Sequence, residues 1–157
     1  PVESVKMMDS IIREAEKHMA KWSHAEGFPK AALKDDALAI SNAAKTLAHD
    51  QDVANIAVFT QSGKTALLMS KTRPRVPIIA FTPEPSTLSQ MSLYWGVNPI
   101  LVPFANSLEE MVQSVDNYLI KRKKLRVGEQ VVLVSGFPVG AMRLPNLALL
   151  HSIGEKV

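Results

Sequence analysis

The side chains most able to do chemistry lie together in one short polar turn of this 157-residue chain. The turn consists of Thr60, Gln61, Ser62, Gly63, Lys64 and Thr65. Apolar runs flank it at 55–59 and 66–69, so we predict a strand, a turn and the start of a helix. The first amides of a helix have no partners within it, and the helix dipole adds about half a positive charge there. Together with the hydroxyls and the ammonium of the turn, these amides predict a phosphate-binding site.

The alternative is an ordinary capped turn, in which Gly63 serves only for its backbone freedom. The neighbouring strands favour the phosphate site. Ligands of α/β sheets bind beyond the carboxyl ends of the strands, and those ends carry the polar turn, Thr82, residues 104–105 and a small-residue loop at 135–140. We therefore expect the turn and the loop to share one edge of the sheet.

Several helices and strands must position this edge. Helical spacing of apolar residues predicts helices at 1–20, 35–49, 64–71, 87–95 and from 107 onward, and continuous apolar runs predict strands at 55–59, 76–81, 99–102, 130–134 and 147–153. Thr87 with Gln90 and Ser107 with Glu110 are predicted capping boxes. The alternation predicts an α/β fold of three layers, α/β/α, around a mostly parallel five-stranded sheet. We expect the last strand to be antiparallel at the edge, with a helix as the alternative there.

The composition is that of a globular protein, with 46% hydrophobic and 21% charged residues. No apolar stretch approaches the ~20 residues of a membrane span, and the N-terminus lacks a signal-peptide pattern, so we expect no membrane partner and a cytoplasmic location. The absence of cysteine excludes disulfides. His18, His24, His49 and His151 show no metal-ligand spacing, so we predict no metal site.

Five cations fall within residues 121–126, in a chain whose formal net charge is +3. Interleaved aromatic residues and a recognition motif are missing from this run, so we expect no nucleic-acid partner. The run precedes Gly128 and is interpreted as a helix C-terminus whose cations complement the dipole. Arg73 is likewise interpreted as a helix-end cation and Trp95 as a packing residue, with interface or ligand contacts as the alternatives.

Four segments resemble the C-terminal α/β domain of pyruvate kinase, in register along nearly the whole chain. They are PVESVKMMDSIIREAE at 1–16, NIAVFTQSGKTALLMSKTRPRVPIIAFTP at 55–83, MSLYWGVNPILV at 91–102 and GEQVVLVSGFPVG at 128–140. The resemblance implies a single domain over 1–157, in which 1–20 is the helix that links to a catalytic barrel and 35–157 is the α/β body. Pro1 in first position also suggests a piece of something longer.

For the intact enzyme, the resemblance implies phosphoryl transfer from phosphoenolpyruvate to ADP. This domain would bind an allosteric effector and contribute to a tetramer interface. Its implied partners are the catalytic barrel of the same chain and further copies of the chain. The barrel's catalytic and metal-binding residues have no counterpart here, so no catalytic or metal residue is named, and Mg²⁺ and K⁺ are expected only with the barrel.

Carried over by position, the effector site includes Thr60, Gln61, Ser62, Gly63, Lys64, Thr65, Gly136, Pro138, Gly140 and Arg143. Lys64 stands where many relatives have Arg, so it offers a point charge in place of a bidentate fork. Arg143 and Pro145 depart from the glycine and Thr-Asn of relatives, and Arg143 could itself bind a phosphate. Fructose 1,6-bisphosphate is therefore a poor candidate, and a sugar monophosphate or a nucleotide monophosphate fits at least as well. A stand-alone enzyme acting on phosphorylated substrates, or a non-catalytic binding or assembly protein, is the alternative.

Overall fold

The computed structural model describes residues 1–22, 35–123, 125–141 and 143–155. The chain divides into two compact units, Pro1–Ala31 and Ala32–Val157. Most of the segment between the first two helices, which the sequence shows as polar and irregular, lies outside the described residues, as does His24.

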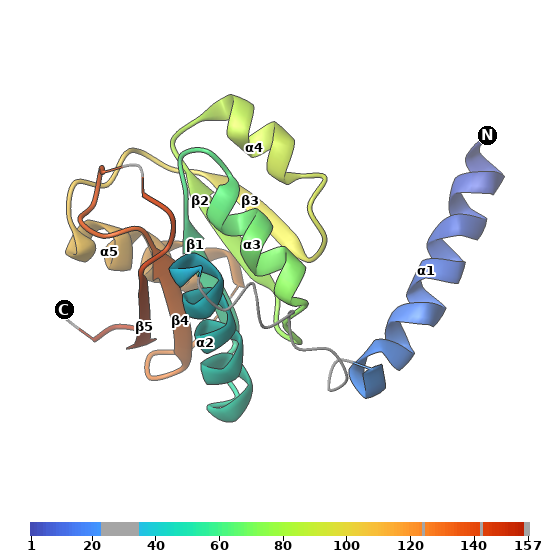
Figure 1. Cartoon of the computed structure of the whole chain (residues 1–157), viewed down its shortest axis with the longest axis horizontal. Coiled ribbons are helices and arrows are strands. Elements are labelled where there is room, and N and C mark those ends of the chain that lie inside the picture. Colours follow the sequence, from blue (N-terminus) through green and yellow to red (C-terminus); the bar gives the residue numbers. More distant parts are fainter. Residues whose placement is uncertain (23–34, 124, 142, 156–157) are drawn as a thin grey trace. The chain divides into compact units, whose positions relative to one another are not determined.

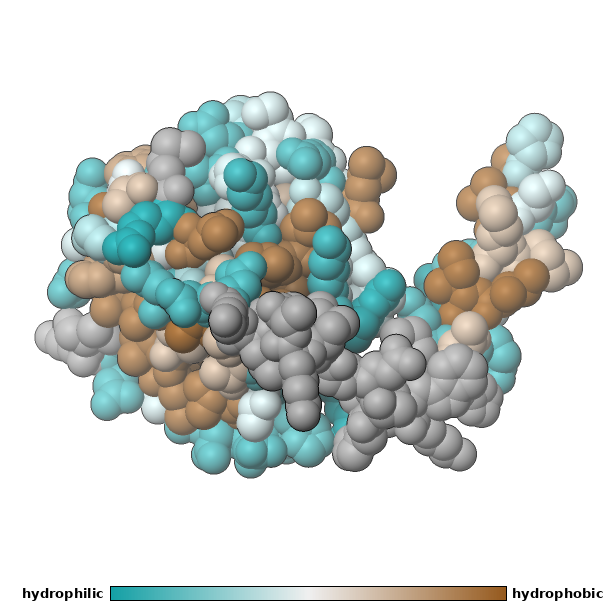
Figure 2. Space-filling view, viewed as in Figure 1, coloured by the Kyte–Doolittle hydropathy of each residue, from teal (hydrophilic) through white to brown (hydrophobic). Residues whose placement is uncertain are grey.

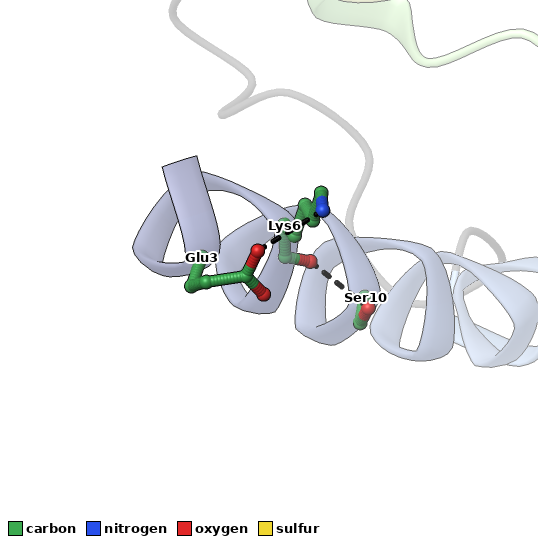
Figure 3. A network of polar contacts seen from close by, with 3 residues as sticks. All are labelled: Glu3, Lys6 and Ser10. Atoms are coloured by element: carbon green, nitrogen blue, oxygen red, sulfur yellow. Dashed lines mark hydrogen bonds and ion pairs between the residues drawn. The ribbon is translucent and has the colours of Figure 1, made fainter. Parts of the chain in front are cut away.

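The first unit contains one long helix, α1 (Val2–Trp22), where the sequence predicts one. Three ion pairs between residues three or four apart support its exposed face, among them Lys6 with Glu3 at 3.0 Å. Figure 3 shows that pair and the hydroxyl of Ser10, which donates to the carbonyl of Lys6 at 2.9 Å. The large apolar side chains between residues 2 and 12 of α1 are exposed within this unit, and Figure 2 shows apolar residues of this helix as brown surface. The helix therefore presents an apolar stripe of the kind that packs against a partner.

The second unit is an α/β body (Figure 1). Its elements are α2 (Asp36–Asp50), β1 (Asn55–Phe59), α3 (Lys64–Thr72), β2 (Ile78–Thr82), α4 (Pro85–Met91), β3 (Val97–Leu101), α5 (Leu108–Tyr118) with a π-helical turn η2 (Leu119–Lys123), β4 (Gln130–Ser135) and β5 (Leu147–Ser152). The strand order is β3-β2-β1-β4-β5, and every pair is parallel except β4 with β5. The predicted mostly parallel sheet with an antiparallel edge strand is confirmed, and β5 excludes the alternative of a helix.

Helices cover both faces of the sheet, which confirms the three-layer prediction. One core joins α2, α3 and α4 to the face that carries Ile56 and Val58 of β1. The other core joins α5 to the opposite face, which carries Ala57 and Phe59. Successive residues of a strand point to opposite faces, so strands covered on both sides are apolar throughout. Strands β1 and β2 are buried at every position for this reason.

One predicted capping box is confirmed in its cap, with the glutamate bonded one residue earlier than the cap, and the other box is wrong. Ser107 caps α5 by accepting a hydrogen bond from the amide of Glu110 at 3.2 Å, and the Glu110 carboxylate accepts one from the amide of Asn106 at 2.7 Å. Helix α4, in contrast, begins two residues before Thr87, at Pro85. Proline suits the first helical position because its fixed φ is helical and its missing N–H needs no partner. That signal outweighs the Thr87–Gln90 pattern.

The basic run continues α5 through η2, as a helix end followed by a turn. Lys121 and Arg122 are exposed there, and Lys124 lies outside the described residues. Among the helices that the structure describes, none combines the length and the apolar character needed to cross a membrane.

Candidate functional site

A pocket of about 70 Å³ opens at the carboxyl ends of the parallel strands. Its lining residues are Phe59, Thr60, Gln61, Ser62, Thr65, Phe81, Pro83, Val102, Pro103, Phe104, Ala105, Met111, Ser135, Gly136, Val139, Gly140 and Arg143. The polar turn after β1 and the loop after β4 therefore share one edge, as predicted from their positions at the carboxyl ends of strands. The pocket lies on the α5 side of the sheet, because Phe59, Phe81 and Met111 belong to the core beneath α5.

The polar turn leaves the start of α3 without a side-chain cap. Gly63 is the residue before the helix, and its φ of +76° lies in the left-handed region that favours glycine. Its amide donates to the hydroxyl of Thr60 at 3.0 Å, and its carbonyl accepts the first helical hydrogen bond, from Leu67 at 2.9 Å. The amides of residues 64–66 precede that first bond, and no side chain caps them. Such amides and the helix dipole attract an anion.

A hydrogen bond from α4 holds the turn in place. The hydroxyl of Thr87 donates to the carbonyl of Gln61 at 2.6 Å. A β-carbon on Gly63 would lie 3.4 Å from both Thr87 and Met91, so α4 also packs closely against the turn. Thr87 thus supports the polar turn and does not begin a helix.

The second wall of the pocket is the loop between β4 and β5. The side chain of Asn146 accepts from the amide of Phe137 at 2.6 Å and donates to its carbonyl at 2.8 Å, which ties the two ends of the loop together. A β-carbon on Gly136 would lie 2.6 Å from the carbonyl oxygen of Arg143, so only glycine allows this close approach. The peptide bond between Phe137 and Pro138 is cis.

Aromatic and apolar side chains form the inner part of the pocket. The rings of Phe59 and Phe81 stack with centroids 5.0 Å apart. Tyr118 of α5 packs edge-on against Phe81, with centroids 5.6 Å apart. Phe104 stands at the outer part of the pocket with 45% of its surface exposed, and it faces Gly140.

Sequence reasoning did not select Ser135, although it named the loop that begins there. This side chain is 1% exposed and lines the pocket, and its hydroxyl oxygen has no hydrogen-bond partner among the described residues. Leaving a buried polar group unpaired costs about 1–3 kcal/mol. The sequence signal was a hydroxyl directly after the buried run 131–134 at the carboxyl end of a strand.

The structure gathers most, but not all, of the candidate residues around the pocket. Thr60, Gln61, Ser62, Thr65, Gly136, Gly140 and Arg143 are lining residues. Gly63, Lys64 and Pro138 are not among the lining residues. Gly63 is buried within the turn, whereas Lys64, the first residue of α3, and Pro138 are exposed.

The charge of the pocket suits an anion. Arg143 is the charged side chain of the described lining, which contains no carboxylate and no imidazole. In the described part of the chain, no group of three or more His, Asp or Glu side chains could hold a metal ion. General acid-base chemistry needs a titrating group within reach of the substrate. The described lining offers no carboxylate or imidazole for such a step, whereas its guanidinium can bind and orient an anionic ligand.

Other residues considered from the sequence lie outside the pocket. Arg73 ends α3 in the left-handed region, and its guanidinium lies 4.3 Å from the ring centroid of Trp95. The hydroxyl of Ser70 donates to the carbonyl of Trp95 at 2.7 Å. These contacts attach the end of α3 to the turn before β3, in agreement with a packing role for Trp95 and with Arg73 as a cation at the end of the helix.

Comparisons with known proteins agree with the fold. The family described as "Pyruvate kinase, alpha/beta domain" matches residues 38–151. A pyruvate kinase of Mycobacterium tuberculosis strain H37Rv is 30% identical over 155 residues, which are 99% of this chain and 32% of that protein. The pyruvate kinase of Sporosarcina psychrophila is 33% identical over 155 residues, 99% of this chain and 26% of that protein.

A crystal structure of a pyruvate kinase from Cryptosporidium parvum shares the fold, with a TM-score of 0.68 at 24% identity over 76% of this chain and 23% of that chain. The chain thus spans about a third or less of the length of these relatives. The matched region contains the whole sheet up to His151 of β5 and both walls of the pocket. The chain belongs to the pyruvate kinase alpha/beta domain family.

Proposed function

We propose that this chain is the regulatory domain of a pyruvate kinase and that its pocket binds the phosphate group of an allosteric effector. The observation that supports this most directly is the uncapped start of α3 beside Arg143, in a described lining without carboxylates. Amides and a guanidinium are the usual phosphate ligands of proteins. The hydroxyls of Thr60, Ser62 and Thr65 add further donors at the same place.

The effector is a monophosphate in this proposal, either a sugar phosphate or a nucleotide monophosphate. The described lining supplies one cluster of phosphate donors and one guanidinium, which suits a single phosphate group. In the intact enzyme, phosphoryl transfer from phosphoenolpyruvate to ADP takes place in a separate catalytic barrel of the same chain. Mg²⁺ and K⁺ are assigned to that barrel in this proposal.

Assembly with that barrel and with further copies of the chain is part of the proposal. It is supported by the exposed apolar side chains of α1, which include Val2, Val5 and Ile12 with exposed fractions of 54–65%. Burying such side chains releases roughly 25 cal/mol for each Å² removed from water. A free-standing binding or assembly protein without catalysis is the competing proposal, and the ligand test below bears on it.

Thermal denaturation of the chain with a panel of sugar monophosphates and nucleotide monophosphates tests the pocket. A ligand present at about 100 times its dissociation constant stabilises the fold by about 2.7 kcal/mol. Replacing Arg143 by Ala should weaken binding by about 2 kcal/mol, or roughly thirtyfold, because a charge-assisted hydrogen bond is lost.

The matched control is Arg126→Ala, which removes the same charge from the loop before β4, at the opposite end of that strand from the pocket. It should leave binding unchanged. If no member of the panel raises the melting temperature of the wild-type chain, the effector proposal is wrong and the assembly proposal gains. Equal losses in both variants would show that only overall charge attracts the ligand.

A further inference from the structure

Ser135 marks a position in the pocket where a ligand group is needed. Its hydroxyl is buried and has no partner among the described residues, and alternation along β4 puts Ser135 on the same face as Val131 and Leu133 of the α5 core. Buried hydroxyls are nearly always hydrogen-bonded, so an unpaired one that lines a pocket points to a ligand atom. This observation is independent of the start of α3.

The pocket has two ends of different character. At the outer end, Ser62 and Arg143 are exposed and can meet a phosphate. Among the buried lining residues, Phe81, Met111 and Phe59 are at most 8% exposed, and the polar side chains are Ser135 at 1% and Thr65 at 3%. Thr65 belongs to the first turn of α3, so Ser135 is the buried polar side chain of the loop wall. A ligand that fills the pocket therefore places an anion at the start of α3 and a mainly apolar body against the aromatic residues, with a polar atom near Ser135.

We infer that Ser135 is a specificity-determining residue and that the ligand is a phosphate monoester with a mainly apolar body carrying a hydrogen-bonding group at its far end. This inference rests on the proposed function and narrows its ligands to those whose body beyond the phosphate is mainly apolar. A sugar phosphate fits less well, because several of its hydroxyls would face phenyl rings and a thioether that offer no hydrogen bond of normal strength. The pocket volume of about 70 Å³ also favours a compact body.

A matched pair of ligands isolates the contact with Ser135. Phenyl phosphate and 4-nitrophenyl phosphate share the phosphate and the ring, and only the second carries an acceptor at the far end. Calorimetric titration of the wild-type chain should show 4-nitrophenyl phosphate binding about fivefold more tightly, as expected for one hydrogen bond. Both should bind at least about tenfold more tightly than glucose 6-phosphate, whose hydroxyls lose water without gaining partners.

The variant Ser135→Ala tests the residue itself. It should abolish the difference between the two aryl phosphates and leave the affinity for inorganic phosphate unchanged. The melting temperature of the free variant should equal or exceed that of the wild type, because the substitution removes an unpaired hydroxyl. If Ser135 had only a structural role, the substitution would lower the melting temperature.

Ser70→Ala is the matched control, since Ser70 is also buried but its hydroxyl is paired with the carbonyl of Trp95. It should lower the melting temperature and keep the preference for 4-nitrophenyl phosphate. Equal affinity of wild type and Ser135→Ala for that ligand, or tighter binding of glucose 6-phosphate, would overturn the inference while leaving the phosphate site intact. If no phosphate compound binds the wild-type chain, the proposed function fails with it.

Discussion

Helices α3 and α5 begin at the same edge of the sheet, yet they treat their first amides in opposite ways. Helix α5 is capped by Ser107 and carries Glu109 and Glu110 in its first turn. Helix α3 follows Gly63, has no side-chain cap, and has no acidic residue in its first turn. The positive end of the α5 dipole is thus neutralised by the chain itself, whereas that of α3 remains available to an external anion.

Other polar groups of α5 are also paired within the chain. Near the other end of α5, the carboxylate of Asp116 lies 2.9 Å from Nε2 of His151 and also accepts from the amide of Gly154 at 2.9 Å. Helix α4 also begins at this edge without a side-chain cap, but its first residue, Pro85, has no N–H, and none of its first residues lines the pocket. The comparison teaches that the candidate anion site is the uncapped helix start that lies at the pocket, whereas the start of α5 is capped by the chain itself.

The largest expected effect comes from breaking the hydrogen bonds between α5 and the C-terminal part of the chain around β5. Asp116→Ala leaves the nearly fully buried ring of His151 and the amide of Gly154 without their partner, which should lower the free energy of unfolding by about 2–3 kcal/mol. Urea denaturation of the chain measures it. Asp116→Asn keeps an acceptor oxygen and should lose less. Phosphate affinity of the folded variant should stay unchanged, and a lost affinity would mean that α5 shares in binding.

The next largest effect is expected from giving the start of α3 an acidic side chain, as the start of α5 has. Ser62→Asp places a carboxylate in the pocket beside the first amides of α3 and should weaken phosphate binding by about 2 kcal/mol, or roughly thirtyfold, through like-charge repulsion. Isothermal titration measures the change. Ser62→Asn has nearly the same shape without the charge, so it should bind almost as the wild type does. Similar losses in both variants would attribute the effect to shape.

A smaller effect compares two serines at the two helix starts. Ser107→Ala removes the cap of α5 and should lower the free energy of unfolding by about 1 kcal/mol. Ser62→Ala removes a hydroxyl that caps nothing, so the change should stay within about 0.5 kcal/mol. Thermal and urea denaturation of the two variants test this pair. Equal destabilisation would contradict the contrast between the two helices.

The smallest effect concerns the pKa of Glu109. Its carboxylate accepts hydrogen bonds from its own backbone N–H and from the hydroxyl of Ser107, and both hold the pKa of Glu109 below its ordinary value. A lowered pKa means that this carboxylate stabilises the fold above the ordinary glutamate pKa, and that the contribution is lost as pH falls through the lowered value. In Ser107→Ala, an NMR titration should find the pKa of Glu109 higher than in the wild type. An unchanged pKa would remove Ser107 from this account.

Local patterns predicted the sheet well, because each buried strand is a short, continuous apolar run, whereas an amphipathic helix has apolar residues only every three or four positions. The cap formed by Ser107 could also be predicted from the sequence, because Glu110 lies only three residues from Ser107 and four from Asn106. The box at Thr87 failed because a competing local signal, Pro85, was given too little weight. The hydroxyl of Thr87 instead bonds to Gln61, 26 residues away, a contact that no local pattern contains.

By itself, the sequence determined the alternating elements, the parallel sheet and the position of the polar turn, since each depends on neighbouring residues and on the handedness of crossover connections. Only the tertiary structure decided which face of the sheet bears the pocket and which candidates line it. It alone also revealed the unpaired hydroxyl of Ser135, because burial and the lack of a partner depend on every segment that packs around that atom. Strand geometry places a side chain above or below a sheet, but the atoms that it meets there come from distant parts of the chain.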